Sequence, residues 1–200
     1  MAENSSTGLT NPSAIISTNF GDITVELYPD KAPKSVSNFI QYAFDDFYDN
    51  VLFHRVVDNF VIQAGLFNAQ GVGKTSALRA PVELESNKGL SNLEGTVGLA
   101  RTDSFNSATS QFYINVGNNV ALDYQSAQQP GYAVFGKITA GLNVAKAIAK
   151  VAVAPNSGFE NVPVSPVVIS DVKLSTGADQ LIPLQSYVAQ SGVNSARLQY

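Results

Sequence analysis

Three polar side chains, Arg55, Gln63 and Gln111, stand in stretches that otherwise read as half-buried β-strands. Burying a guanidinium group costs free energy unless something uses its charge, and the neighbouring motifs offer Arg55 no obvious carboxylate. Because a guanidinium stays charged and holds its N–H donors rigidly, it can stabilise an electron-rich atom that forms in a transition state. The pattern therefore predicts a site built around a fixed donor. The alternatives are an ion-paired arginine and two amides that the backbone satisfies.

The stretches that hold these residues resemble the signature of a known family. Residues 53–65 read FHRVVDNFVIQAG, and residues 110–115 read SQFYIN. Both motifs, in this order, resemble those of the cyclophilins, the cyclosporin-binding class of peptidyl-prolyl cis-trans isomerases. The resemblance runs from about Ala14 to Leu174, and the segments AVFGKI and ENVPVSPVVIS look most like the bacterial, periplasmic branch. It implies an enzyme that accelerates rotation about X-Pro bonds in peptides and unfolded proteins and so assists folding.

The family resemblance also implies a role for each matching residue. Arg55 would be the catalytic donor, and Gln63 would brace it and grip the substrate backbone. The residues expected to bind the proline ring are Phe60, Val61, Tyr113 and Leu122. Those expected beside the rest of the substrate are Ala100, Arg101, Gln111 and Tyr132. No metal, nucleotide or covalent intermediate is implied. Two alternatives stay open: ordinary barrel core for the apolar residues, and a proline-peptide binding module or holdase without significant turnover for the whole protein.

The chain departs from the family pattern at several of these positions. Ala121 stands where the family often has a large aromatic residue that contacts cyclosporin, which predicts weak cyclosporin binding with turnover mostly retained. Tyr113 replaces the usual Phe, so its hydroxyl group must find water or a partner. Arg101 replaces a frequent Asn, and Tyr132 replaces a frequent His. Ala64 replaces the first residue of a usual Gly-Gly pair, which puts the local backbone angles in question.

Two further motifs invite chemistry that the sequence does not support. His54 is the single histidine of the chain, and in a strand it should point away from Arg55, so we expect a structural residue rather than a general base. Residues 71–75, GVGKT, nearly match a phosphate-binding loop. However, Asn68 occupies the position of the first required glycine, and Pro81 leaves little room for the helix that must follow. We expect a loop that borders the groove.

The elements that must position these residues are short strands and two helices. Strands are expected at 14–18, 22–27, 51–56, 60–64, 96–100, 111–116, 133–138 and 167–174. One helix is expected to begin at Pro33, a second to span 142–151, and long loops to fill 66–94. Strands with short links predict a mainly β fold: a closed eight-stranded antiparallel β-barrel capped by two α-helices, as the family also implies. Residues 1–13 are expected to be a polar lead-in, 14–174 the isomerase domain and 175–200 a C-terminal extension.

Composition narrows the remaining possibilities. Hydrophobic residues make up 44% of the chain and charged residues 14%, which is typical of a folded globular protein. A net charge of −4 without a basic cluster argues against nucleic acid and anionic lipid as partners. The absence of cysteine excludes disulfides and thiol chemistry. No apolar run approaches the ~18 residues of a membrane span, and we expect a monomer. The low charge and the bacterial resemblance favour a mature periplasmic chain over a cytoplasmic one.

Overall fold

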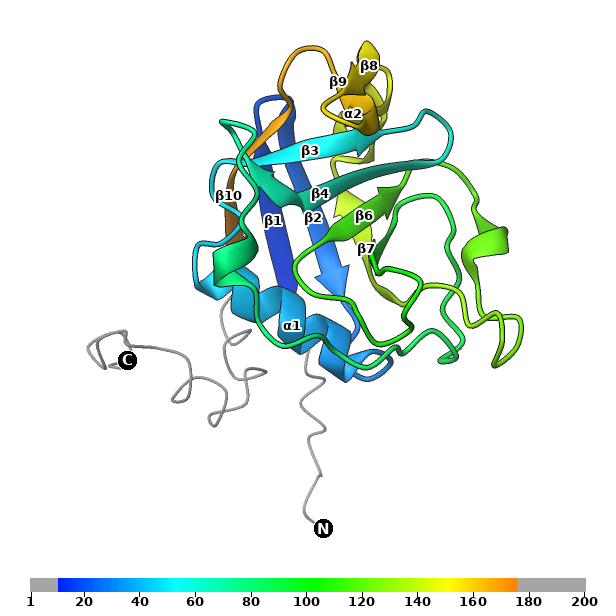
Figure 1. Ribbon diagram of the computed structural model, residues 1–200. Helices are drawn as coiled ribbons and strands as arrows, with labels where there is room; N and C mark the ends of the chain where they lie inside the picture. Colours follow the sequence, from blue (N-terminus) through cyan, green and yellow to red (C-terminus); the bar gives the residue numbers. More distant parts are fainter. Residues whose placement is uncertain (1–10, 176–200) are drawn as a thin grey trace, which may run out of the picture.

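The computed structural model describes residues 11–175, and eight of its strands close into one barrel (Figure 1). Their order around the barrel is β1-β10-β3-β4-β6-β5-β7-β2, and all neighbours are antiparallel. The strands are β1 (Ser13–Thr18), β2 (Gly21–Leu27), β3 (Val51–Val56), β4 (Val61–Asn68), β5 (Thr96–Leu99), β6 (Phe112–Asn115), β7 (Val134–Ala140) and β10 (Val168–Leu174). The predicted fold class is confirmed. Most of the expected lead-in and extension, residues 1–10 and 176–200, lies outside the described residues.

Two α-helices lie at opposite ends of the barrel (Figure 1). Helix α1 (Pro33–Phe44) begins with proline at its first position, where the missing N–H has no intrahelical partner to lose. Its predicted apolar face, which includes Phe39 and Ile40, is buried. Helix α2 (Leu142–Ala149) ends two residues before the predicted end. Within residues 11–175, no helix has the length and apolar character needed to cross a bilayer.

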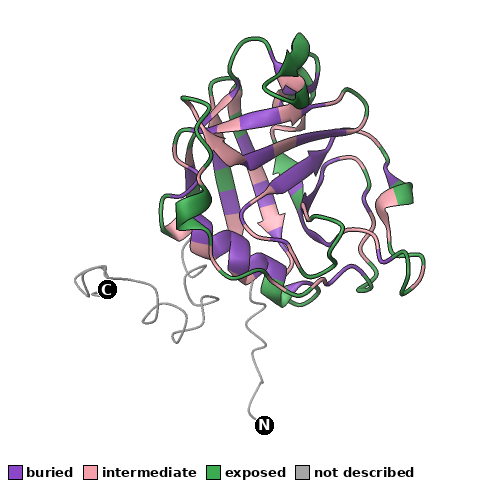
Figure 2. Ribbon diagram, in the orientation of Figure 1, coloured by how far each residue is buried: buried purple, intermediate pink, exposed green. Residues whose placement is uncertain are grey.

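The core links α1 to the strand that carries part of the predicted site. The ring of Phe39 lies 5.3 Å from that of Tyr48, 5.5 Å from that of Phe112 and 5.3 Å from that of Phe135, measured between centroids. In Figure 2 most of helix α1 has the colour of buried residues. Tilted and edge-on aromatic pairs stabilise by about 0.5–1.5 kcal/mol each beyond area burial. Since Phe112 is locked in this cluster, Tyr113 is held on the other face of β6.

One element was absent from the sequence prediction. Strands β8 (Val153–Asn156) and β9 (Phe159–Pro163) form a separate two-stranded hairpin. Ser157 and Gly158 connect them with φ values of 50° and 84°, as a two-residue hairpin turn with two positive φ angles requires. The Ser-Gly pair was the available signal, but the prolines in both strands and the exposure of β8 hid it.

The GVGKT segment does not form a phosphate-binding loop. Its last residue begins a single 3₁₀ turn, η1 (Thr75–Ala77), and not the α-helix that such a loop needs. The Lys74 ammonium group donates to the carbonyl of Phe47 and lies 4.5 Å from the centroid of its ring. Lys74 therefore fastens this loop to the segment after α1.

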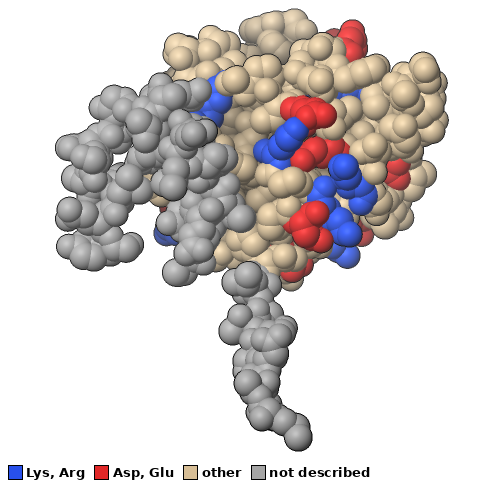
Figure 3. Space-filling view, turned by 90° about the horizontal axis from the view of Figure 1, so that it is seen from below, with Lys and Arg blue, Asp and Glu red and all other residues tan. Residues whose placement is uncertain are grey.

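On the face seen from below, Lys and Arg side chains lie beside Asp and Glu side chains and form no separate positive or negative patch (Figure 3). The described ion pairs include Lys34–Glu83 and Arg79–Asp45.

Candidate active site

A β-bulge in β3 brings Arg55 to the same face of the sheet as Gln63. Phe53 pairs with Ala64, but Arg55 pairs with Gln63, so β3 uses two residues where β4 uses one. Side chains alternate between faces along a strand, so without the bulge Arg55 would share the face of Phe53, which lies in the core. The extra residue therefore turns the guanidinium group out of the barrel.

Two neighbouring rows of paired residues show the consequence. The first row crosses β3, β4, β6 and β5 and is buried in the barrel core: Phe53, Ala64, Phe112 and Leu99. The next row crosses the same strands on the outer face: Arg55, Gln63, Tyr113 and Gly98. The predicted site is thus on the outer wall of the barrel, and its parts come from four strands.

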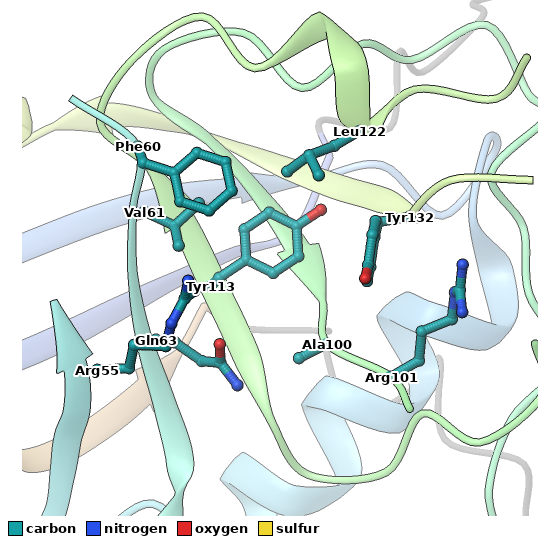
Figure 4. A pocket seen from close by; sticks show the side chains of 9 residues that line it. All are labelled: Arg55, Phe60, Val61, Gln63, Ala100, Arg101, Tyr113, Leu122 and Tyr132. Atoms are coloured by element: carbon teal, nitrogen blue, oxygen red, sulfur yellow. The ribbon is translucent and has the colours of Figure 1, made fainter. Parts of the chain in front are cut away.

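A cavity of about 310 Å³ opens over this outer row (Figure 4). Its lining consists of Arg55, Phe60, Val61, Gln63, Ala100, Arg101, Tyr113, Leu122 and Tyr132. The structure therefore brings together nine of the ten predicted site residues. The tenth, Gln111, adjoins the cavity through a hydrogen bond of 2.9 Å, which Gln63 Nε2 donates to Gln111 Oε1. The cavity has a volume typical of small-molecule and peptide side-chain sites.

Arg55 has no carboxylate partner in the part of the chain that the structure describes. None of the ion pairs there includes it, so the ion-paired alternative is wrong. Its guanidinium carbon lies 5.6 Å from the centroid of the Phe60 ring, a cation–π contact that orients the half-buried side chain. The side-chain amide of Gln63 donates to Gln111 and packs beside Arg55 without a hydrogen bond to it among the described contacts. The N–H donors of Arg55 remain available to a ligand.

The apolar walls of the cavity come from loops as well as from barrel strands β4 and β6. Phe60 follows the Asp58-Asn59 turn, in which Asn59 has a φ of 55°, and Leu122 ends the 3₁₀ turn η2 (Val120–Leu122). The rings of Tyr113 and Tyr132 meet edge to face with centroids 6.1 Å apart. The backbone N–H of Tyr132 donates to the carbonyl of Leu122 over 2.9 Å. Loops from different parts of the chain thus close the cavity around a space suited to a flat apolar ring.

The hydroxyl group of Tyr113 has the partner that the sequence required. It donates to Asn92 Oδ1 over 2.6 Å, and the backbone N–H and Nδ2 of Asn92 both donate to Asp123 Oδ1, over 2.7 and 2.8 Å. Burial raises the pKa of Tyr113, so the phenol stays protonated. Because Asp123 follows Leu122 directly, this network joins two walls of the cavity. The sequence prediction missed Asn92 and Asp123, although the need of the Tyr113 hydroxyl for a partner was a signal.

The carboxyl group of Asp123 stays ionised within this network. Burial raises its pKa, but hydrogen bonds from Ser91 and Asn92 lower it by more, and its pKa falls below the usual value. Ser91 Oγ and the two Asn92 groups are its donors. An ionised acceptor with several donors is a strong anchor. It fixes the end of η2 against the loop that contains Asn92.

Glycine is required at two positions around the site. At Gly98 a Cβ atom would lie 2.4 Å from the Tyr113 hydroxyl oxygen and 2.5 Å from Cζ, so the ring lies flat across a position that no side chain can share. At Gly65 the φ is 99°, and a Cβ would lie 2.4 Å from the carbonyl oxygen of Ser110. Ala64 is outside the left-handed region and fully buried. Replacement of the first glycine of the usual pair therefore leaves the backbone unstrained.

Comparison with known proteins agrees with this geometry. The family model described as "Cyclophilin type peptidyl-prolyl cis-trans isomerase/CLD" matches residues 13–174. The chain belongs to the cyclophilin family. It is 43% identical over 168 residues to a peptidyl-prolyl cis-trans isomerase of Acinetobacter baylyi, covering 84% of this chain and 88% of that protein. It is 41% identical over 160 residues to peptidyl-prolyl cis-trans isomerase B of Escherichia coli, covering 79% and 96%. The protein is a peptidyl-prolyl cis-trans isomerase, and its bacterial resemblance is confirmed.

Solved structures show the same fold. A cyclophilin type peptidyl-prolyl cis-trans isomerase of Cryptosporidium parvum aligns with a TM-score of 0.68 at 24% identity, covering 82% of this chain and 98% of that chain. A second structure with that description was determined in the presence of the dipeptide ala-pro, with the same TM-score of 0.68. The barrel of this cyclophilin is therefore the family barrel.

His54 lies outside the cavity of this cyclophilin. Its ring is 5% exposed and packs edge-on against Phe67, with centroids 5.6 Å apart. Burial lowers the pKa of His54 to about 4, against smaller opposing effects of the Leu52 carbonyl and the Gln111 side chain. The imidazole is therefore neutral at physiological pH. Because the cavity lining contains no histidine, cysteine or carboxylate, we expect kcat/KM to be flat between about pH 6 and pH 8. A bell-shaped profile centred near pH 6.5 would contradict this.

The stability of the protein should depend on His54 at acidic pH. An unfolded histidine has a pKa of about 6.5. Below this pH His54 is therefore protonated in the unfolded chain, whereas in the folded chain it stays neutral until the pH falls to about 4. The free energy of unfolding therefore falls as pH falls through this window, and between pH 7 and pH 5 the loss from His54 is about 2 kcal/mol. Urea unfolding at both pH values would measure it. His54→Gln should lose about 2 kcal/mol less than the wild type, and equal losses would exclude His54 as the cause.

Proposed function

We propose that this isomerase seats the proline ring of an X-Pro segment between Phe60, Val61, Tyr113 and Leu122, with Arg55 aimed at the prolyl nitrogen. The observation that carries the proposal is the Arg55 guanidinium group at the edge of an apolar cavity, without an ion-pair partner among residues 11–175. Gln63 and Gln111, joined by their own hydrogen bond, would hold the substrate backbone beside it. Ala100, which directly follows β5, and Arg101 would lie along the flanking residues.

The proposed role of Arg55 follows from the barrier to the reaction. Rotation about a peptide bond costs ~18–20 kcal/mol because amide resonance must break, whereas the cis and trans forms of X-Pro differ by only about 0.5–1 kcal/mol. In the twisted transition state the prolyl nitrogen regains a lone pair. An N–H donor aimed at that atom binds the transition state more tightly than either planar ground state, which is the condition for catalysis. The apolar walls exclude water and strengthen this hydrogen bond.

The direct test is the exchange rate of a peptide of the Ala-Ala-Pro-Phe type, measured by NMR exchange spectroscopy with and without the wild-type protein. We expect exchange to be accelerated at catalytic concentrations of protein. The resonances of Tyr113 and Leu122 should shift when the peptide is added, because these residues would contact the proline ring. Peptide binding without acceleration would instead leave a proline-recognition module. Acceleration without shifts at these residues would place the reaction elsewhere on the molecule.

Cyclosporin should inhibit this cyclophilin only weakly. Ala121 is exposed, directly precedes the cavity residue Leu122 and offers only a methyl group, where the family often has a large aromatic contact. Loss of one large aromatic contact at a binding site costs roughly 2–4 kcal/mol, which corresponds to about a 30- to 1000-fold weaker affinity. Titration calorimetry with the wild type and with Ala121→Trp measures the difference. Nanomolar inhibition of the wild type, or no gain in Ala121→Trp, would contradict this expectation.

Two further expectations concern the cellular context. The periplasmic location and the monomeric state remain predictions from the sequence and the family resemblance. Cell fractionation of the producing bacterium and sedimentation of the purified protein would check them.

A further inference from the structure

Arg101 is held in one orientation at the end of the cavity remote from Arg55 (Figure 4). Its guanidinium carbon lies 4.6 Å from the centroid of the Tyr132 ring and 5.3 Å from that of Phe105. Nε donates to the carbonyl of Gly131 over 3.0 Å, and Nη1 donates to the carbonyl of Thr102 over 2.8 Å. Two aromatic contacts and two backbone acceptors thus restrict a side chain that would otherwise be free to rotate.

The charge of Arg101 is not neutralised by the residues around it. Among the described residues no carboxylate lies within ion-pair distance, and Nη2 has no hydrogen-bond partner. The cavity lining contains two guanidinium groups and no Asp or Glu, although the chain carries a net charge of −4. The nearby Asp123 is engaged by Ser91 and Asn92. The cavity is therefore a positive site on a negative protein.

We propose that Arg101 is a specificity-determining residue that favours substrates with Asp or Glu within two residues of the proline. This inference rests on the proposed function of the cavity. A planar guanidinium with a free N–H edge matches the geometry of a carboxylate better than an ammonium group does. Because the side chain is already ordered by its two rings, binding the carboxylate loses little further conformational entropy. Because Arg101 is half-buried, solvent also screens the attraction between its guanidinium group and the carboxylate less than it would in bulk water.

The experiment compares paired peptides of the type Ala-Ala-Pro-Phe-Ala that differ only in Glu or Gln. The substitution is made in turn at each of the two positions before and the two positions after the proline. For each pair the ratio of kcat/KM for Glu to that for Gln is measured by NMR exchange, so any change in basal activity cancels. In the wild type we expect a ratio of roughly three to ten at one of these positions at low ionic strength, falling as salt is added.

Two variants assign the effect to Arg101. Arg101→Gln should bring the ratio to about one, whereas Arg101→Lys, which keeps the charge but loses the planar geometry, should give an intermediate ratio. Lys137→Gln is the matched control, because it removes one positive charge from an exposed position outside the cavity lining. It should keep the wild-type ratio.

Four results would overturn the inference. A ratio near one at all positions in the wild type would exclude acid selection. A ratio that persists in Arg101→Gln, or that falls equally in Lys137→Gln, would assign the preference to another group or to the overall field. If the wild type accelerates none of the peptides, the proposed function fails and this inference with it. Equal acceleration of the Glu and Gln peptides leaves the isomerase mechanism intact and removes only the role of Arg101.

Discussion

Replacement of Arg55 by alanine is expected to slow peptide exchange roughly 10- to 150-fold, while peptide affinity changes little. The variant removes one charge-assisted hydrogen bond, worth ~1.5–3 kcal/mol, that we assign to the transition state alone. Because the walls of the cavity would remain, the ground state should bind almost as before. The measurement is exchange spectroscopy at saturating and subsaturating peptide, so that kcat and KM are separated.

Arg55→Lys is the matched control for charge. It keeps a cation at the cavity edge but loses the rigid fork and part of the contact with Phe60. We expect it to recover only a fraction of the lost rate. If Arg55→Ala turned over at the wild-type rate, the donor mechanism would be wrong. If it lost affinity and rate in equal measure, Arg55 would be a binding residue only. The urea midpoint should stay near that of the wild type, because Arg55 has no ion pair among the described residues.

Gly98→Ala is expected to lower kcat/KM at least tenfold, because the new methyl group and the Tyr113 ring cannot occupy the same space. The added Cβ would lie 2.4 Å from the hydroxyl oxygen of Tyr113, and that hydroxyl is tied to Asn92. The ring must therefore move into the cavity or break its hydrogen bond. Overpacking of this kind costs about 1–3 kcal/mol, so both activity and the free energy of unfolding should fall. Steady-state kinetics and urea unfolding measure the two effects.

Gly73→Ala is the matched control for this substitution. Gly73 has no positive φ, and the nearest atom to an added Cβ is 3.7 Å away, in ordinary van der Waals contact. It should change neither activity nor stability by a measurable amount. Wild-type activity in Gly98→Ala would mean that the Tyr113 ring does not occupy the position described here. A loss of stability without a loss of activity would mean that the position of the Tyr113 ring does not affect the binding of proline.

Much of the architecture could be predicted because local patterns of residue types in the sequence indicate it. Short runs of apolar and β-branched residues mark each of the eight barrel strands, and the spacing of Phe39 and Ile40 marks the buried face of α1. The two motifs place Arg55 and Gln63 on adjacent strands and Tyr113 on the next. Family resemblance then supplied the roles, which alternation alone could not. The hairpin of β8 and β9 was missed because β8 is exposed and contains Pro155 and β9 ends on Pro163, so neither strand shows an apolar run like those of the barrel strands.

Only the tertiary structure decided which face each functional group occupies and what holds it there. The bulge that turns Arg55 outward depends on the register between β3 and β4, which is a property of the pair and not of either strand. Asn92, Tyr113 and Asp123 are distant in sequence and meet only when the barrel closes. The same is true of Arg101, whose orientation depends on Tyr132 and Gly131 from a distant loop. A single sequence carries residue types and local periodicity, whereas contacts between distant segments arise from packing the whole chain, and these contacts set the geometry of the site.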